Sequence, residues 1–191
     1  MKVLALFSLA SVAAGVTIRN HFEDNCRGGY LDFPNIPPRV CAVAVYDSNI
    51  RGAVTVAYSQ MPPYSPMYGW QARDGYTCGT IVKGDFAGSA DNKCMGKLAG
   101  TALYSGSSWS QPGLHNVKGG RDVACTGKVT PHSIVLNDGH KYALNSMDDE
   151  MFKSLYRMAA KGTTSQELPI EYEAFEIEME SAQQRAQEIQ G

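Results

Sequence analysis

The chain has 191 residues, of which 43% are hydrophobic, and its formal net charge at pH 7 is −2. This length and apolar fraction suffice for one domain with a real core and exclude a chain that is disordered overall. The near-neutral charge gives no electrostatic case for nucleic acid as a partner.

The first fifteen residues have the pattern of a secretory signal peptide. Residues 1–2 form a short basic start, residues 3–12 are apolar, and residues 13–15 are small. A signal peptidase needs small residues near the bond that it cleaves, and an apolar run of this length is too short to span a bilayer. We therefore expect a secreted, extracellular protein without stable membrane insertion.

Five cysteines follow this segment: Cys26, Cys41, Cys78, Cys94 and Cys125. In a secreted chain most cysteines pair as disulfides, and five leave one over. We expect Cys26 to pair with Cys41 and Cys78 with Cys94, because each pair closes a short loop, although other pairings stay open. For the odd Cys125, a structural thiol and a dimer linked through it are the two alternatives.

The first part of the mature chain predicts four strands. Residues 16–18, 30–33, 42–46 and 54–58 are runs rich in β-branched and aromatic residues. Residues 47–52 contain Asp, Asn and Gly, which favour a turn. The third and fourth strands are therefore predicted to form an antiparallel hairpin.

The middle of the chain alternates strands with long loops. Residues 60–70 combine three prolines with aromatic residues and predict an ordered loop, and residues 75–82 predict a strand. Residues 83–97 are polar and rich in glycine, which favours a loop. Residues 101–104 are a short strand candidate, and residues 105–121 predict irregular surface structure.

A hairpin and a helix are the most readable elements. Residues 133–136 and 140–144 flank an Asp-Gly turn. Ser146 and the acids after it suit a helix N-terminus, Gly162 suits its end, and we expect a helix over residues 147–161. Its apolar residues recur at helical spacing: Met151, Phe152, Leu155, Met158 and Ala159.

Residues 165–191 form an acidic tail. They carry seven glutamates against one arginine, so their formal charge is −6. The alternation around Phe175 predicts a strand to about Glu180, followed by a frayed helix or disorder. A tail of this kind solvates the chain or binds a basic partner.

These elements predict an α+β fold, mostly antiparallel β, stabilised by disulfides and with one C-terminal helix packed on the sheet. The expected organisation is a signal peptide over residues 1–15, a single β-rich domain over residues 16–164 that ends in the hairpin and helix, and the acidic tail over residues 165–191.

Catalytic signatures are missing from the sequence, which leaves an enzyme uncertain and less favoured. There is no zinc-protease, serine-hydrolase or phosphate-loop motif. Cys125 followed by His132, His140 and Asn145 has the residue types of a cysteine nucleophile with its base, but the order alone is unspecific, and a structural thiol is preferred. No catalytic residue, metal site or cofactor is predicted.

The best candidate binding surface lies in residues 62–70. Rigid prolines there present Tyr64, Tyr68 and Trp70. Aromatic side chains give a large contact area at low entropic cost, so we expect these three residues to bind a partner. The alternative is that the rings cover the β core.

Part of the sequence resembles the βγ-crystallin-like motif of small secreted proteins of filamentous fungi. The pattern consists of residues 16–18, 26–29, 33–37, Cys41 and 53–56. More broadly, the signal peptide, the modest size and the odd cysteine count resemble fungal effector-type secreted proteins. These likenesses imply a disulfide-stabilised β fold and a role outside the producing cell.

The preferred hypothesis is a secreted, non-enzymatic protein that binds a protein or glycan of a host or cell surface, in an effector or virulence role. One alternative is a small secreted hydrolase or nuclease with an unrecognised site. The other is an extracellular structural or carbohydrate-binding protein that uses the aromatic residues 64, 68 and 70.

Overall fold

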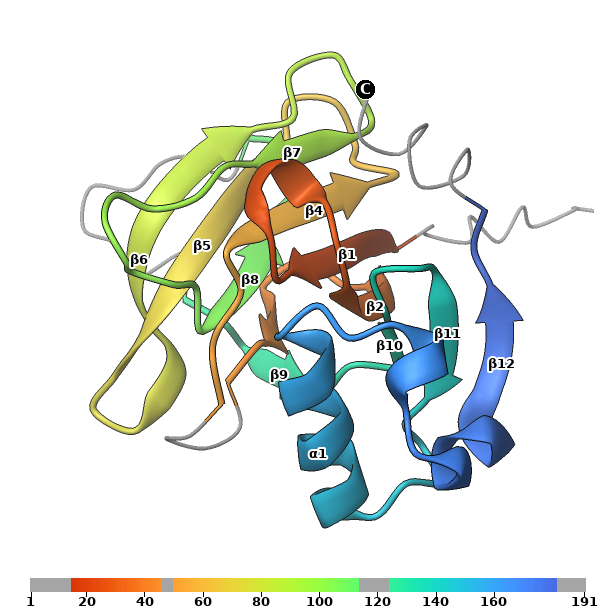
Figure 1. Cartoon of the computed structure of the whole chain (residues 1–191). Coiled ribbons are helices and arrows are strands. Elements are labelled where there is room, and N and C mark those ends of the chain that lie inside the picture. Colours follow the sequence, from red (N-terminus) through yellow and green to blue (C-terminus); the bar gives the residue numbers. More distant parts are fainter. Residues whose placement is uncertain (1–14, 46–49, 114–123, 182–191) are drawn as a thin grey trace, which may run out of the picture.

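The computed structural model describes residues 15–45, 50–113 and 124–181, whose strands form two sheets (Figure 1). The seven-stranded sheet has the order β12, β11, β10, β2, β1, β4, β7, and the five-stranded sheet has the order β6, β5, β8, β3, β9. The named strands pair antiparallel, apart from the parallel pair β3 and β9. The strands are β1 (Val16–His21), β2 (Tyr30–Ile36), β3 (Val40–Val43), β4 (Thr55–Ser59), β5 (Pro66–Arg73), β6 (Tyr76–Phe86), β7 (Lys93–Met95), β8 (Gly106–Trp109), β9 (Gly127–Val129), β10 (Ser133–Val135), β11 (His140–Ala143) and β12 (Glu176–Met179).

Helix α1 (Asp149–Ala159) packs at one end of the sheets, beside β10. The fold is therefore α+β and mostly antiparallel, as expected, and the helix prediction is confirmed. Its N-cap is Asp148, whose carboxylate accepts a hydrogen bond from the Met151 amide at 2.8 Å, two residues after the expected Ser146. Three short 3₁₀ helices complete the described elements: η1 (Asp24–Cys26), η2 (Ser165–Glu167) and η3 (Ile170–Phe175).

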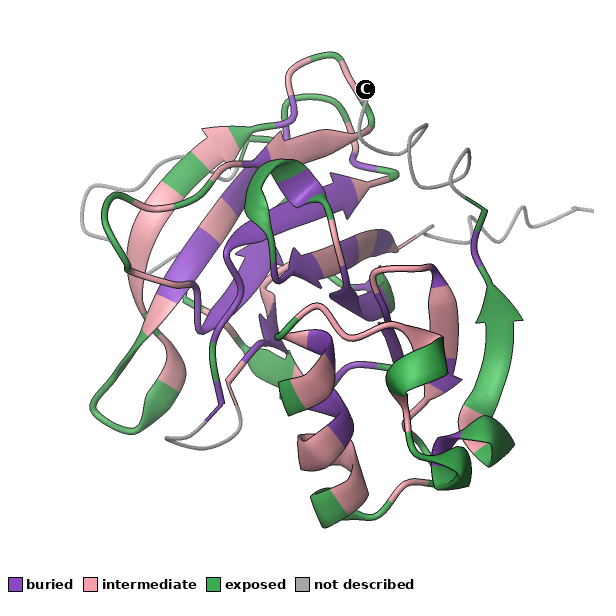
Figure 2. Ribbon diagram, in the orientation of Figure 1, coloured by how far each residue is buried: buried purple, intermediate pink, exposed green. Residues whose placement is uncertain are grey.

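The core lies between the two sheets, where the buried residues concentrate (Figure 2). Alternation along the strands produces this core. In β1, Val16 and Ile18 are fully buried, while Thr17 and Arg19 turn to the opposite face. Asn20 links the two layers: its amide donates to the Ala42 carbonyl at 3.3 Å and accepts from the Ser107 hydroxyl at 2.8 Å. Each sheet thus has an inner face and an outer face.

The strands expected near residues 42–46 and 54–58 exist as β3 and β4, but the prediction that they form a hairpin is wrong. Strand β3 lies in the five-stranded sheet, whereas β4 pairs with β1 and β7 in the other sheet. Local propensity identifies a strand but not its partner, and in a two-layer fold consecutive strands often change sheet.

The loops expected in the middle of the chain were partly wrong. Strand β5 begins inside the expected loop of residues 60–70, with Pro66 at the first strand position, where its missing N–H is tolerated. Strands β7 and β8 also fall in segments predicted as irregular, and residues 101–104 contribute one isolated bridge, from Tyr104. Glycine favours loops in general, but Gly69 lies inside strand β5. A Cβ at this position would lie 2.2 Å from the Tyr104 ring, so glycine is needed there for packing.

The C-terminal hairpin is confirmed as β10 and β11, and β12 confirms the strand in the tail. The expected signal peptide and the end of the acidic tail fall on residues 1–14 and 182–191, which lie outside the described residues. Strand β1 begins at Val16, immediately after the expected cleavage region.

The disulfides join the same four cysteines in a different pairing. Cys26 bonds Cys94, and Cys41 bonds Cys78, so the expected short loops are wrong. Cys26 lies in η1 against β4, next to β7 and Cys94, while Cys41 lies in the other sheet. The bridges close loops of 68 and 37 residues, and on the chain-entropy model each contributes about 4 kcal/mol.

Candidate functional site

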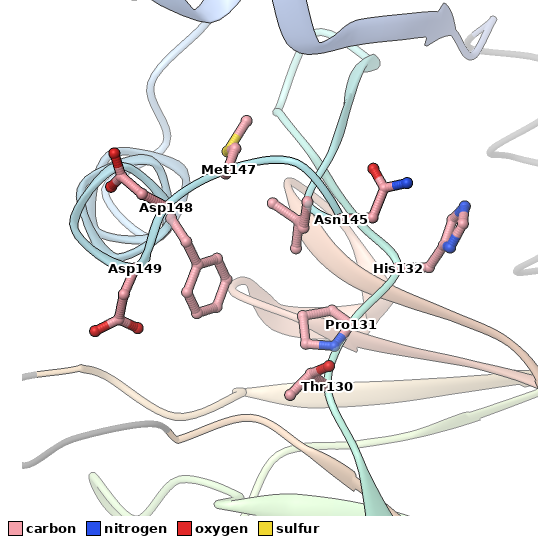
Figure 3. Close-up of a pocket in the computed structure, with 9 residues that line it drawn as sticks. Thr130, Pro131, His132, Asn145, Met147, Asp148 and Asp149 are labelled. Atoms are coloured by element: carbon pink, nitrogen blue, oxygen red, sulfur yellow. The ribbon is translucent and has the colours of Figure 1, made fainter.

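A pocket of about 510 Å³ lies between the start of α1 and the open end of the β10 and β11 hairpin (Figure 3). Figure 3 shows the helix with Asp148 and Asp149 on one side and His132 and Asn145 on the opposite side. We call this the α1 pocket. Its lining residues are Thr130, Pro131, His132, Leu144, Asn145, Met147, Asp148, Asp149 and Phe152.

Backbone hydrogen bonds hold the walls of the α1 pocket in place. The Leu144 amide donates to the His132 carbonyl at 3.1 Å, and the His132 amide donates to the Asp32 carbonyl of β2 at 2.9 Å. The Met147 amide closes a turn on the Leu144 carbonyl at 3.2 Å. The pocket is therefore built on the sheet and on the helix cap, which fix its shape.

The α1 pocket combines an apolar floor with a polar rim. Pro131 is buried, and Leu144 and Phe152 pack against the core. Of the two acids, Asp148 caps the helix, and Asp149 forms an ion pair of 2.5 Å with Lys153. The exposed rim side chains His132 and Asn145 offer hydrogen-bonding groups, an arrangement that suits recognition of a partly apolar ligand.

The outer face of the seven-stranded sheet carries a buried ionic network. Asp32 accepts contacts from Arg19 Nε at 3.2 Å and from Lys141 Nζ at 2.9 Å, and Glu180 lies 3.5 Å from Arg19. The Tyr30 hydroxyl donates to Glu180, and the Arg19 guanidinium lies 4.9 Å from the centroid of the Tyr30 ring. The charges of the two cations and the two acids balance. Because Glu180 belongs to the tail and its partners Arg19 and Tyr30 belong to the sheet, the network fastens the tail to the sheet.

Burial also shifts the pKa values of Tyr30, which belongs to this network, and of His21 beside it. Burial is the main cause that raises the pKa of Tyr30 far above its ordinary value, so the phenol stays neutral. Burial likewise lowers the pKa of His21 to about 3, and its ring lies 4.7 Å from that of Tyr30. The His21 ring is therefore neutral at ordinary pH.

The tail presents an acidic edge. Strand β12 lies at the border of the seven-stranded sheet, and its Ile177 and Met179 side chains are 53% and 61% exposed. Exposed glutamates alternate with them, and Glu176 contacts His140 Nδ1 at 2.7 Å. The acidic character expected of the tail is thus displayed on a strand.

The three predicted binding aromatics do not form one surface. Tyr64 is 65% exposed and Tyr68 is half-buried, but Trp70 is only 4% exposed and its indole N–H donates to the Ser108 hydroxyl at 2.8 Å. Trp70 therefore stabilises the five-stranded sheet. Phe86, which no sequence pattern indicated, is 52% exposed on β6, where it pairs with the start of β5 near Tyr64.

Cys125 is the free cysteine of the described chain, and it is half-buried. Burial raises the pKa of its thiol, while the Ser108 hydroxyl and the charge of Arg39 act in the opposite direction. A catalytic thiol needs a lowered pKa, so the raised pKa of Cys125 does not support its role as a cysteine nucleophile. Its Sγ lies within 4.8 Å of the sulfurs of Cys41 and Cys78.

These features define a disulfide-linked α+β protein built from two sheets, with a pocket beside its helix. Two family models match the chain, the N-terminal domain of ARB_05566 over residues 17–132 and its C-terminal domain over residues 137–191. A protein of Arthroderma benhamiae, described as an uncharacterized secreted protein, is 56% identical over 190 residues and covers 99% of both chains. The chain belongs to this ARB_05566 family of fungal secreted proteins and is itself secreted.

The two matched parts of the family share one sheet, because β10, which lies between them in the sequence, pairs with β2 of the N-terminal part and with β11 of the C-terminal part. No solved structure matches the chain, so the resemblance to βγ-crystallin-like proteins stays a prediction. Of the helices in the described residues, none has the length and apolar character needed to cross a membrane.

Proposed function

We propose that this secreted protein acts by binding a partner outside the producing cell, without catalysis, in an effector-type role. The observation that supports this proposal is the α1 pocket, an apolar floor framed by hydrogen-bonding side chains on a rigid scaffold. Sites that recognise ligands combine these features: apolar area supplies affinity, and a few polar groups fix orientation.

The two carboxylates beside the α1 pocket favour binding over catalysis. Asp148 is bound to the helix N-terminus and Asp149 to Lys153, so both carboxylates are already engaged. Catalytic acids and bases need free positions facing a substrate. A partner is instead expected to insert an apolar side chain toward Phe152 and to hydrogen-bond with His132 and Asn145.

Glycan binding at the end of the β5 and β6 hairpin is the second candidate. Tyr64 and Phe86 are large, exposed rings on neighbouring segments, since the Tyr64 amide donates to the Gly88 carbonyl at 2.7 Å. Flat exposed rings suit stacking against a sugar. This surface would serve the structural or carbohydrate-binding alternative.

Matched double variants distinguish the two surfaces. The secreted protein is used to isolate partners from host extracellular fluid, and each purified partner is then titrated calorimetrically. We expect His132→Ala with Asn145→Ala to weaken binding by about tenfold or more, equivalent to about 1.4 kcal/mol. Tyr64→Ala with Phe86→Ala is the control and should leave the dissociation constant unchanged.

The reverse pattern would place the partner on the hairpin and contradict the role of the α1 pocket. Chemical conversion of the isolated partner by the wild-type protein would contradict a non-catalytic role. Because all four positions are exposed, both double variants are expected to fold. Circular dichroism checks that they do.

A further inference from the structure

Three sulfurs gather on the outer face of the five-stranded sheet. The Sγ atoms of Cys41, Cys78 and Cys125 all lie within 4.8 Å of one another, although Cys41 and Cys78 already form a disulfide. Gly106 of β8 makes room for them, because a Cβ there would lie 2.8 Å from the sulfur of Cys78 and 3.0 Å from that of Cys41. A free thiol is thus held against a disulfide.

The local topology places Cys125 with Cys41. Cys125 comes two residues before β9, which pairs in parallel with β3, the strand that carries Cys41. The Thr126 amide donates to the Arg39 carbonyl at 2.8 Å and extends this pairing toward Cys125. A bond between Cys41 and Cys125 would therefore link neighbouring strands.

Cys78 differs from Cys41 in exposure and attachment. Cys41 is 2% exposed on β3, which pairs with β8 and β9 on its two sides, whereas Cys78 is half-buried near the start of β6, an edge strand in the pairing order. Tyr76, two residues earlier in the chain, is 73% exposed. Of the two sulfurs in the disulfide, Cys78 is therefore the one better placed to reach solvent if the bond opens.

We propose that these three cysteines form a thiol–disulfide exchange site that transfers the reactive thiol from Cys125 to Cys78. The Cys125 thiolate attacks the sulfur of Cys41, the Cys41–Cys78 bond breaks as the Cys41–Cys125 bond forms, and Cys78 leaves as a thiolate. The proton lost by Cys125 is balanced by the proton that Cys78 takes up. One disulfide and one thiol exist before and after the step, so no oxidant is consumed.

The groups that face Cys125 set the pH at which exchange proceeds. Burial raises the pKa of the Cys125 thiol, the Ser108 hydroxyl and the Arg39 charge partly offset this rise, and the Tyr58 phenol lies close enough to interact. Because the attacking species is the thiolate, the exchange rate should rise with pH above neutrality. The Cys78 thiol can then exchange with a disulfide of an extracellular partner.

Oxidised glutathione is the probe for this site. In the folded wild-type protein the Cys78 thiolate attacks it, which gives a Cys78–glutathione disulfide and one reduced glutathione. After acid quenching and non-reducing digestion, mass spectrometry should find glutathione on Cys78 together with a Cys41–Cys125 linked peptide. The yield should rise from pH 6 to pH 9, while the Cys26–Cys94 peptide stays unchanged as the internal control.

Two variants complete the test. Cys125→Ser removes the attacking thiol and should leave the Cys41–Cys78 bond intact, with no glutathione attached. Cys78→Ser should fold with a Cys41–Cys125 disulfide and likewise take up no glutathione. Three results would each overturn the proposal. They are glutathione attached to Cys125 alone, no glutathione attached at any pH, and a Cys78→Ser variant that keeps Cys41 and Cys125 as free thiols.

Discussion

The outer faces of the two sheets are stabilised in different ways. On the seven-stranded sheet, Arg19, Asp32 and Glu180 belong to a buried ionic network that fastens the tail. On the five-stranded sheet, the Cys41–Cys78 disulfide and the hydrogen bond of Trp70 hold the strands across their outer surface. One face depends on charge and therefore on pH, whereas the other depends on a covalent bond and therefore on redox conditions.

Neither outer face contains the α1 pocket, which lies at the helix end of the fold. The two faces therefore differ in what holds them together, and the α1 pocket, where we propose that a partner binds, is separate from both. Substitutions in each face measure how much that face contributes to the stability of the fold.

Removing the central carboxylate of the ionic network should have the largest effect. Asp32→Ala leaves Arg19 and Lys141 buried without their shared acid, and breaking a buried pair costs about 3–5 kcal/mol. Urea unfolding measures the loss. Asp24→Ala is the control, because its 2.6 Å ion pair with Lys97 is exposed and should contribute less than about 1 kcal/mol.

Removing the covalent link of the other face should cost about 4 kcal/mol, as the chain-entropy model gives for a loop of 37 residues. The change is Cys41→Ala with Cys78→Ala in a Cys125→Ala background, and Cys125→Ala alone is the reference. Denaturant unfolding should show a loss that does not depend on pH between 5 and 8. A stability equal to the reference would mean that the disulfide adds nothing to this face.

His21 should make the charged side of the molecule sensitive to acid. Burial lowers the pKa of the folded His21 to about 3, whereas the unfolded residue keeps an ordinary pKa. The unfolded chain therefore binds the extra proton between these values, and stability is lost as the pH falls below about 6.5. At pH 4 the loss should be about 3 kcal/mol relative to pH 7.

His21→Gln tests this pH effect. The variant should lose about 3 kcal/mol less than the wild type between pH 7 and pH 4 in denaturant unfolding. His132→Gln, at an exposed position, is the control and should keep the wild-type profile. Equal pH profiles for the wild type and His21→Gln would contradict the assigned burial effect.

The helix cap beside the α1 pocket should give the smallest effect. Asp148→Ala removes the 2.8 Å hydrogen bond to the Met151 amide and should lower the unfolding free energy by about 1 kcal/mol. Asp148→Asn retains the cap and should recover most of the loss. Thermal unfolding of both variants measures the difference.

Elements with local signals were predictable from the sequence. The Asp-Gly turn between β10 and β11 and the apolar spacing of α1 identified both elements, because a hairpin and an amphipathic helix are encoded by adjacent residues. Alternation in the tail likewise identified β12.

Features that depend on distant pairing were not predictable in the same way. Cys26 pairs with Cys94 because η1 lies against β4, and no short loop indicates this. The ionic network assembles residues from β1, β2, β11 and the tail. Trp70 looked like a recognition residue in a proline-rich run, but sheet pairing buries it against Ser108. In each case the decisive contact comes from another part of the chain.

Site-specific photo-crosslinking determines where the partner binds on the protein. A photoreactive amino acid replaces Asn145 at the rim of the α1 pocket in one protein and Tyr64 on the hairpin in another, and each is irradiated with the isolated extracellular partner. We expect a covalent adduct from position 145 and none from position 64. An adduct from position 64 alone would contradict binding at the α1 pocket.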